Sequence, residues 1–479
     1  MTHPFERIYP YVPVWAQNLG ISIYGIFYRH ERLGGNFEQY VTQFQERDHW
    51  STDLMNDYIT KQLRQQLLKA FIEVPYYRES WSSIGIDNNF LELTTPETLF
   101  RLPILPKREL RMAPERFVSD RVRQQERLIT YHTSGSTGTP IKFICTPDTQ
   151  RRIYAAKEVR SFRWAKTSIR LPRSMIGGRL VVPRAYSKGP FYRYNWAEKQ
   201  VYFSAFHISP VNVSQYVEGF NWFRPQVLTG YAHSYFLLAR MMAEQAIVLD
   251  YEPQALVLGS EKLTPEMKEV ISRSFRARAY QEYGAVESCM LATECEHGSL
   301  HVNPDAGIVE IVDENGFPVP PGIEGRILCT SLLNEAQPLI RYEIGDIGVW
   351  SNQTCSCGRE HLAVLQEVVG RLEDVVVGPD GREMVRFHGI FVELPHVIEG
   401  QVIQEAPDLF TVNVIAMDGF GVQDEQLIRK RFEERLGKVE VHIKRVQEIE
   451  RSGSGKFRAV IRNFQIEKHN NYVSLGRKA

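Results

Sequence analysis

The spacing of hydrophobic and polar positions changes along the chain and divides it into regions. Between residues 56 and 75, apolar side chains such as Leu63, Leu67 and Phe71 recur at helical spacing, which predicts an amphipathic helix. In the middle of the chain, short apolar runs alternate with helical patterns, as in βαβ units built around a parallel sheet. The runs predicted as strands are 178–183, 226–230, 255–260 and 277–284.

Local signals mark the helix that follows the predicted strand at 255–260. Thr264 is suited to cap its N-terminus, and Pro265 fits the first helical position. Its apolar face is formed by Met267, Val270, Ile271 and Phe275.

Beyond residue 300 the pattern becomes a strict alternation of apolar and polar residues, with Asn315-Gly316 as a turn signal. This predicts an antiparallel hairpin or a small barrel-like β region. The last hundred residues change again, to a strand at 409–417, a helix at 424–437 that Gly437 can end, and a strand at 439–446.

We therefore expect an α/β protein of two domains. The large N-terminal domain, residues 1–371, has βαβ-type sheets plus a small barrel-like β region and begins with an N-terminal arm at 1–55. The small α+β C-terminal domain spans 372–479, with the boundary near 371–374.

One stretch near the N-terminus, 11–28, carries no charge and is long enough to raise the question of a membrane. Pro13, Gln17, Asn18 and Ser22 interrupt it. They favour a buried helix or a packed arm over a membrane-surface contact, and either of these over a transmembrane segment.

Composition narrows the class of protein. The 479 residues are 43% hydrophobic and 24% charged, as in soluble globular proteins of more than one domain. Lys plus Arg equals Asp plus Glu, 57 each, so no global field attracts nucleic acid. Six cysteines are sparse for this length and, without a visible signal peptide, suggest a cytoplasmic protein.

A Gly/Ser/Thr-rich segment at 131–143 contains a lysine, Lys142, near its end. Glycines let backbone N–H groups turn toward an anion, and the hydroxyls add donors, so the segment is suited to cradle phosphates. It lacks the Gly-Lys-Ser/Thr ending of a Walker loop. From composition alone, a loop that binds nothing is an equally open interpretation.

The same segment, "TSGSTGTPIK", resembles the signature loop of the adenylate-forming superfamily, which includes acyl-CoA synthetases, luciferases and peptide-synthetase adenylation domains. Further resemblances follow in the family's order and together span about 130–460. They are "LGSEKL" (258–263), "YQEYGAVES" (280–288), "RYEIGDIG" (341–348), "GRLED" (370–374) and "RSGSGKFR" (451–458). "AFIEVPYYRES", "LPILPKREL" and "CSCGRE" are most similar to the phenylacetate–CoA ligase branch and its CapK-like relatives in polysaccharide gene clusters.

The resemblance implies roles for individual residues. Lys456 would be the catalytic lysine of a mobile C-terminal domain, Glu287 and Thr137 would hold Mg²⁺, Tyr283 would stack on the base, and Asp346 would bind the ribose. The nucleotide would also be contacted by Thr133, Ser134, Gly135, Ser136, Gly138, Lys142, Gly259, Ser260, Glu261, Gly284 and Arg371.

The activity that the resemblance implies is activation of a small carboxylic acid by ATP with release of pyrophosphate, followed by acyl transfer to CoA. An amine, a sugar hydroxyl or a carrier protein remains open as the acceptor, because "GREMVRFHGIFVE" (381–393) departs from the stretch that usually helps to receive CoA. A non-catalytic nucleotide-binding relative is a second alternative. A role in capsular polysaccharide biosynthesis rests on analogy. Whether the protein is a homodimer stays open.

Two short Cys/His clusters could form a metal site. Cys295 and His301 lie about 60 residues before Cys355 and Cys357, and such pairs can meet across a hairpin as a tetrahedral zinc site. The resemblance to related ligases of this branch implies a structural metal here, one that takes no part in the chemistry. Free cytosolic thiols are the alternative.

Overall fold

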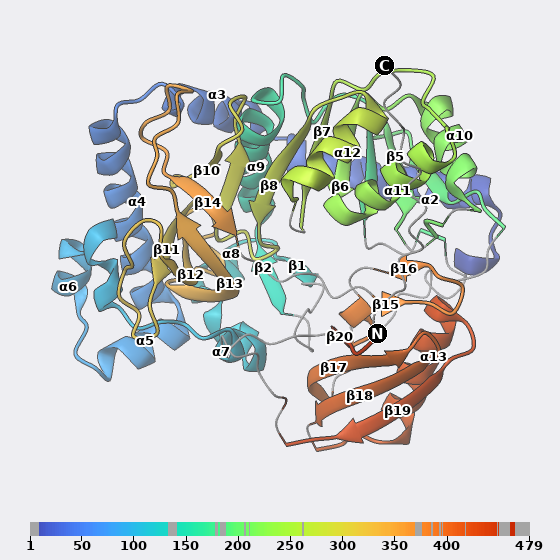
Figure 1. The fold of residues 1–479 in the computed structure, drawn as a ribbon. Coiled ribbons are helices and arrows are strands. Elements are labelled where there is room, and N and C mark those ends of the chain that lie inside the picture. Colours follow the sequence, from blue (N-terminus) through green and yellow to red (C-terminus); the bar gives the residue numbers. More distant parts are fainter. Residues whose placement is uncertain are drawn as a thin grey trace.

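The computed structural model (Figure 1) describes most of the chain. The described residues are 9–132, 141–177, 181–182, 188–205, 207–209, 211–260, 263–368, 376–384, 387–391, 394, 396–416, 418–447, 449 and 460–464.

One twelve-stranded sheet forms the centre of the molecule, with the strand order β11-β12-β13-β14-β10-β9-β8-β7-β6-β3-β5-β4. Its strands β5, β3, β6, β7 and β8 run parallel to one another, and the rest are antiparallel. The strand bounds are β3 (Arg173–Gly177), β4 (Tyr192–Asn195), β5 (Gln200–Ser204), β6 (Val227–Tyr231), β7 (Ala255–Gly259), β8 (Ala279–Gly284), β9 (Leu291–Glu294), β10 (Leu300–Val302), β11 (Gly307–Val312), β12 (Glu324–Ser331), β13 (Tyr342–Trp350) and β14 (Val364–Val368).

The parallel strands are buried on both faces, which explains why they read as continuous apolar runs. On one face Leu228, Leu256 and Leu258 pack with helices α10 (Val213–Phe223), α11 (Ala232–Glu244) and α12 (Pro265–Phe275). On the other face Val227 and Val257 pack against the segment that follows α9 (Pro147–Lys157) and its π-helical turn, Glu158–Arg163.

Three of the four predicted strands in this region are confirmed as β6, β7 and β8. The helix after β7 is confirmed, with the Thr264 side chain accepting the backbone N–H of Met267 and Pro265 at its start. The strand predicted at 178–183 is wrong in position, because the neighbouring β3 ends at Gly177 and the described Val181 and Val182 form a bend.

The predicted hairpin beyond residue 300 is confirmed as β11 and β12, with Gly316 at a positive φ of 87° in the turn. No separate barrel forms from the described strands. Strands β11 to β14 continue the large sheet through the β14–β10 pair instead, and β11 ends it. The reason is that β10 pairs with β9 and β9 pairs with β8. The antiparallel strands are thereby joined to the edge of the parallel strands in one sheet.

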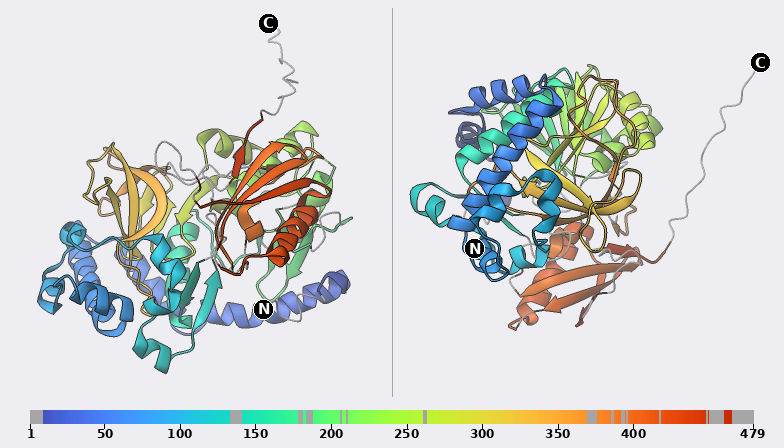
Figure 2. Two further views of the ribbon diagram at one scale, coloured as in Figure 1. Left: turned by 90° about the horizontal axis from the view of Figure 1, so that it is seen from below. Right: turned by 90° about the vertical axis from the view of Figure 1, so that its left-hand side faces the viewer.

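Helices of the first 125 residues wrap the outside of the sheet (Figures 1 and 2). The helix predicted at 56–75 is confirmed as α4, which begins a few residues earlier at a Ser51 cap. The helices are α2 (Val14–Leu33), α3 (Phe37–Arg47), α4 (Thr52–Glu73), α5 (Pro75–Ser82), α6 (Asn88–Leu93), α7 (Lys107–Met112) and α8 (Asp120–Gln125).

The uncharged stretch at 11–28 falls mainly in α2, which packs along the edge strand β4 and against α9. The prediction that it is packed is confirmed, but much of its apolar surface is exposed. Among the helices described, none combines the length and the apolar character needed to cross a membrane.

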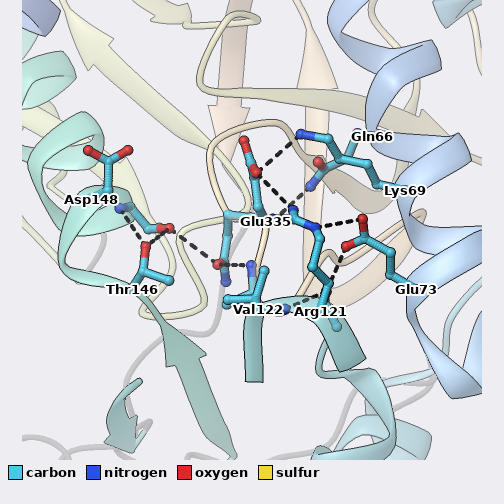
Figure 3. Close-up of polar contacts among 12 residues, drawn as sticks. Gln66, Lys69, Glu73, Arg121, Val122, Thr146, Asp148 and Glu335 are labelled. Atoms are coloured by element: carbon cyan, nitrogen blue, oxygen red, sulfur yellow. Dashed lines mark hydrogen bonds and ion pairs between the residues drawn. The ribbon is translucent and has the colours of Figure 1, made fainter. Parts of the chain in front are cut away.

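A short hairpin of β1 (Ile129–His132) and β2 (Lys142–Cys145) frames the Gly/Ser/Thr-rich segment. The loop between β12 and β13 holds β2 in place, because the side-chain amide of Asn334 donates to the carbonyl of Ile144 at 2.9 Å. The neighbouring Glu335 lies between Lys69 and Arg121, which binds it to α4 and α8 (Figure 3).

The C-terminal part of the chain forms a second sheet of four strands, with the order β19-β18-β17-β20 (Figure 1). Helix α13 packs on it through Ile428, Phe432 and Leu436, and Gly437 ends that helix at φ 78°, as predicted. The elements are β15 (Val376–Val377), β16 (Glu383–Met384), β17 (Val397–Ala406), β18 (Leu409–Ala416), α13 (Val422–Leu436), β19 (Glu440–Arg445) and β20 (Val460–Arg462).

Candidate active site

The carboxyl ends of three neighbouring parallel strands meet at one edge of the sheet. Tyr231 at the end of β6 pairs with Gly259 at the end of β7, and Gly259 pairs with Glu282 in β8. A side chain at Gly259 is excluded, since its Cβ would lie 2.6 Å from the carbonyl oxygen of Glu282. In open α/β sheets, ligands bind outside this edge.

Asp346 is presented toward this edge by an irregularity in β13. Arg326 of β12 pairs with Ile347 but Leu328 pairs with Glu343, so residues 344–346 form a bulge opposite a single residue. Gly345 takes a φ of 91° there, which a side chain would strain. Asp346 therefore lies on a bulge within strand β13.

Asp346 and Tyr283 lie side by side, although 63 residues separate them. The Tyr283 hydroxyl donates to Oδ2 of Asp346 at 2.9 Å. Burial, with Asp346 adding to it, raises the pKa of Tyr283 well above its ordinary value, so this hydroxyl stays a donor. Two of the predicted nucleotide ligands are therefore neighbours.

Glu287 lies in the loop that leaves β8, and it is buried with 4% exposure. The hydroxyl of Tyr342, at the start of β13, donates to its Oε1 at 2.9 Å. Burial and Glu287 raise the pKa of Tyr342 well above its ordinary value. A buried carboxylate oxygen of this kind is the ligand type that Mg²⁺ prefers, so the residue fits the role predicted for it.

Lys107, at the start of α7, is a site neighbour that sequence reasoning missed. Its Nζ lies 3.9 Å from Oε1 of Glu287 and donates to the carbonyl of Ile344 at 2.9 Å. The isolated parallel bridge between Leu105 and Tyr342 places it there. Lys107 lies in "LPILPKREL", one of the stretches that resemble the phenylacetate–CoA ligase branch, and that stretch is the signal in the sequence that could point to it.

Several predicted site residues lie outside the described residues. They are Thr133, Ser134, Gly135, Ser136, Thr137, Gly138, Glu261, Arg371 and Lys456. Of the others, Lys142 is half exposed at the start of β2, and its Nζ lies 3.9 Å from Oε1 of Glu115. Ser260 follows β7 and takes a positive φ of 69°. Gly284 is the last residue of β8.

The four residues predicted to bind zinc come together at one corner of the antiparallel region. Their ligand atoms, from Cys295, His301, Cys355 and Cys357, all lie within 4.8 Å of one another. The Cys295 and Cys355 sulfurs are 3.7 Å apart, and Nε2 of His301 is 3.3 Å from the Cys357 sulfur. Such separations suit four ligands around one tetrahedral zinc ion.

The orientation of His301 also fits a metal ligand. Its Nδ1 lies 2.9 Å from the carbonyl oxygen of Leu362, which fixes the proton on that nitrogen and leaves Nε2 free to coordinate. The ring is fully buried and meets Trp164 edge-on. Two sulfurs and the ring therefore converge with Cys357 without any rearrangement of the backbone.

Comparison with known proteins gives matches to one family model and to several proteins. The family described as the CapK C-terminal domain matches residues 377–463. Protein CapK of Staphylococcus aureus is 26% identical, over 96% of this chain and 99% of that protein. A phenylacetate-coenzyme A ligase of Thermus thermophilus is 26% identical, over 66% of this chain and 70% of that protein.

Solved structures agree on the fold. A 2-hydroxyisobutyryl-CoA ligase in complex with 2-HIB-AMP and CoA matches with a TM-score of 0.55 and 21% identity, over 86% of this chain and 90% of that chain. The chain therefore shares the fold of this ligase and is similar in sequence to CapK and to phenylacetate-coenzyme A ligases. Among the matched sequences, the chain is similar to CapK over nearly its whole length and to the phenylacetate-coenzyme A ligases over about two thirds of it.

Proposed function

We propose that this protein activates a small carboxylic acid with ATP, forming an acyl-adenylate and pyrophosphate, and then transfers the acyl group to CoA. The observation that carries the proposal is the meeting of Tyr283, Asp346 and Glu287 at one sheet edge. These side chains come from two motifs distant in sequence, and the nucleotide roles predicted for them require that they be close.

Each residue has a distinct task in this reaction. Asp346 accepts hydrogen bonds from the ribose hydroxyls, and the Tyr283 ring supports the base beside it. The segment from Thr133 to Gly138 binds the β- and γ-phosphates through backbone N–H groups and hydroxyls. Lys456 stabilises the charge that develops when the carboxylate attacks the α-phosphate.

Glu287, with Thr137, would hold Mg²⁺, which supplies positive charge next to the phosphates. Lys107 stands beside the same carboxylate, so the chain provides a compensating cation there before any metal binds. We infer that the second step follows rotation of residues 372–479 about Glu373 and Asp374, as the resemblance implies.

The experiment is pyrophosphate release by the full chain with ATP, Mg²⁺ and a panel of aryl, hydroxy and short aliphatic acids, with and without CoA. Acid-dependent pyrophosphate together with an acyl-CoA product supports both steps. An acyl-adenylate that CoA does not consume points to an amine, a sugar hydroxyl or a carrier protein as acceptor. Nucleotide binding without pyrophosphate from any acid supports a non-catalytic relative, and free phosphate contradicts the proposal.

Glu287→Gln should lower the rate of acid-dependent pyrophosphate release about tenfold to a hundredfold, because an amide is a poor ligand for a hard divalent cation. The Tyr342 hydroxyl can still donate to the amide oxygen, so the fold should persist. The Mg²⁺ concentration for half-maximal rate should rise. The matched control is Glu314→Gln, an exposed glutamate in the turn after β11. An unchanged Mg²⁺ dependence would exclude Glu287 as a ligand.

We also infer that Cys295, His301, Cys355 and Cys357 hold a structural zinc ion. The purified protein should contain about one zinc per chain by elemental analysis, and Cys357→Ser should lose it along with thermal stability. Cys145→Ser is the control, since that buried thiol in β2 contacts Gln150 and lies outside the cluster. Metal-free protein with three titratable thiols at this corner, those of Cys295, Cys355 and Cys357, would favour the free-thiol alternative.

A further inference from the structure

Helix α2 turns its polar residues toward the protein. Its inward face lies along β4, the edge strand of the large sheet, where Asn18 accepts the backbone N–H of Tyr194 at 3.0 Å and Ser22 accepts that of Trp196 at 3.2 Å. An edge strand needs partners for its backbone donors, and here side chains of α2 provide them. Ile21 and Tyr28 of the helix pack against the protein, but most of its other large apolar residues are exposed.

The outward face is an almost unbroken apolar stripe. Trp15 is 70% exposed and Phe27 is 68% exposed. Trp15, Leu19, Ile23 and Phe27 recur at every fourth position, which places them on one side of the helix. Trp196, 51% exposed, begins the turn that contacts Ser22 and adds a second tryptophan beside the helix. The exposed apolar residues of this surface, the α2 stripe, are Tyr11, Trp15, Leu19, Ile23, Tyr24, Ile26 and Phe27.

Contiguous apolar surfaces of this kind are uncommon on monomeric soluble proteins and usually mark a contact. In the left view of Figure 2, α2 is the dark blue helix that runs along the lower edge of the molecule, with no other described element on its outer side. The stripe is thus accessible along its length.

The charges around the stripe identify its partner. In the described residues 9–33 and 192–200, the exposed charged side chains are Arg29 and Lys199. The two acids of these segments are taken up by ion pairs: Glu31 by Arg127, and the buried Glu198 by arginines. Arg29 and Lys199 therefore place positive charge next to the apolar stripe, which is complementary to anionic head groups.

We propose that α2 is a membrane-surface contact that lies flat on an anionic bilayer. Trp and Tyr rings favour the boundary between head groups and acyl chains, and the aliphatic residues between them extend the inserted area. The polar face of α2 stays bound to β4, which holds the helix parallel to the bilayer. This binding is independent of the reaction at the candidate active site.

The test is flotation of the full chain with phosphatidylcholine vesicles, with and without phosphatidylglycerol. We expect binding to the anionic vesicles that weakens with salt. Replacing Trp15 and Phe27 together by serine should weaken it more than tenfold, because two large apolar side chains no longer insert. Arg29→Gln should weaken it about fivefold, and on anionic vesicles alone. Trp222→Ser, 80% exposed on α10, is the matched control and should bind like the native chain.

Absence of binding to anionic vesicles would overturn the proposal. The same holds if Trp222→Ser loses as much vesicle binding as the Trp15/Phe27 variant. Light scattering on the same samples tests a second copy of the chain as the occupant. A native dimer that dissociates in the Trp15/Phe27 variant, without vesicle binding, would assign the stripe to self-association instead. Unchanged circular dichroism melting of each variant shows that the fold is intact.

Discussion

Lys456→Ala is expected to lower kcat for acid-dependent pyrophosphate release about 10²- to 10³-fold, the loss typical when one group that stabilises developing charge is removed. The lysine acts on oxygens that gain charge in the transition state, so the KM for ATP should change far less than kcat. Lys456 follows two glycines and shortly precedes β20, which is paired with β17.

The control for this variant is Lys444→Ala, a lysine on strand β19 of the same small sheet. It should retain the native rate. If the Lys456 variant releases pyrophosphate at the native rate, this lysine has no role in the reaction. That result would not bear on the nucleotide-binding residues. A rise in the KM for ATP equal to the fall in kcat/KM would assign it to ground-state binding.

Asp305→Asn is expected to destabilise the fold by about 3–5 kcal/mol, since it breaks a fully buried ion pair, takes the carboxylate partner from Arg47 and leaves Arg160 with Asp48 alone. Asp305 accepts from Arg160 at 2.5 and 3.0 Å and from Arg47 at 2.6 Å. Arg160 and Asp305 are both buried completely. The melting temperature should fall by at least about 5 °C.

The pH dependence of this effect follows from the pKa of Asp305. Burial acts to raise that pKa, but Arg160 and Arg47 outweigh it and hold it below its ordinary value. The carboxylate therefore stabilises the fold above about pH 4, and this contribution is lost as the pH falls through the folded-state pKa. The melting curves of the native chain and the variant should converge in acid. Asp250→Asn, which breaks an exposed pair with Arg224, is the control and should cost under about 1 kcal/mol.

The sequence was most informative where local chemistry decides the structure. The apolar runs that predicted β6 and β7 are buried on both faces of the sheet. Thr264 caps the helix that follows it, and Gly437 ends another helix at a positive φ. Each of these features lies within a few residues of the sequence pattern that predicted it. Cys355 and Cys357 were paired correctly with Cys295 and His301 because few cysteines compete in the chain.

Features that depend on distant parts of the chain could not be read in this way. The approach of Lys107 to Glu287 requires that α7 be positioned by β13, far along the sequence. The bulge that presents Asp346 depends on the pairing of β13 with β12. The apolar pattern of α2 was visible, but periodicity does not tell which face turns inward, and the edge of β4 decides that.

The cover that α2 provides for β4 has a consequence for shortened chains. A chain that begins after Leu33 would keep the proposed active-site residues, yet the backbone N–H groups of Tyr194 and Trp196 would lose the side-chain acceptors that now satisfy them. Another strand could then add to that open edge. Such a truncated protein should precipitate or form ordered aggregates by strand addition, however well its remaining core packs.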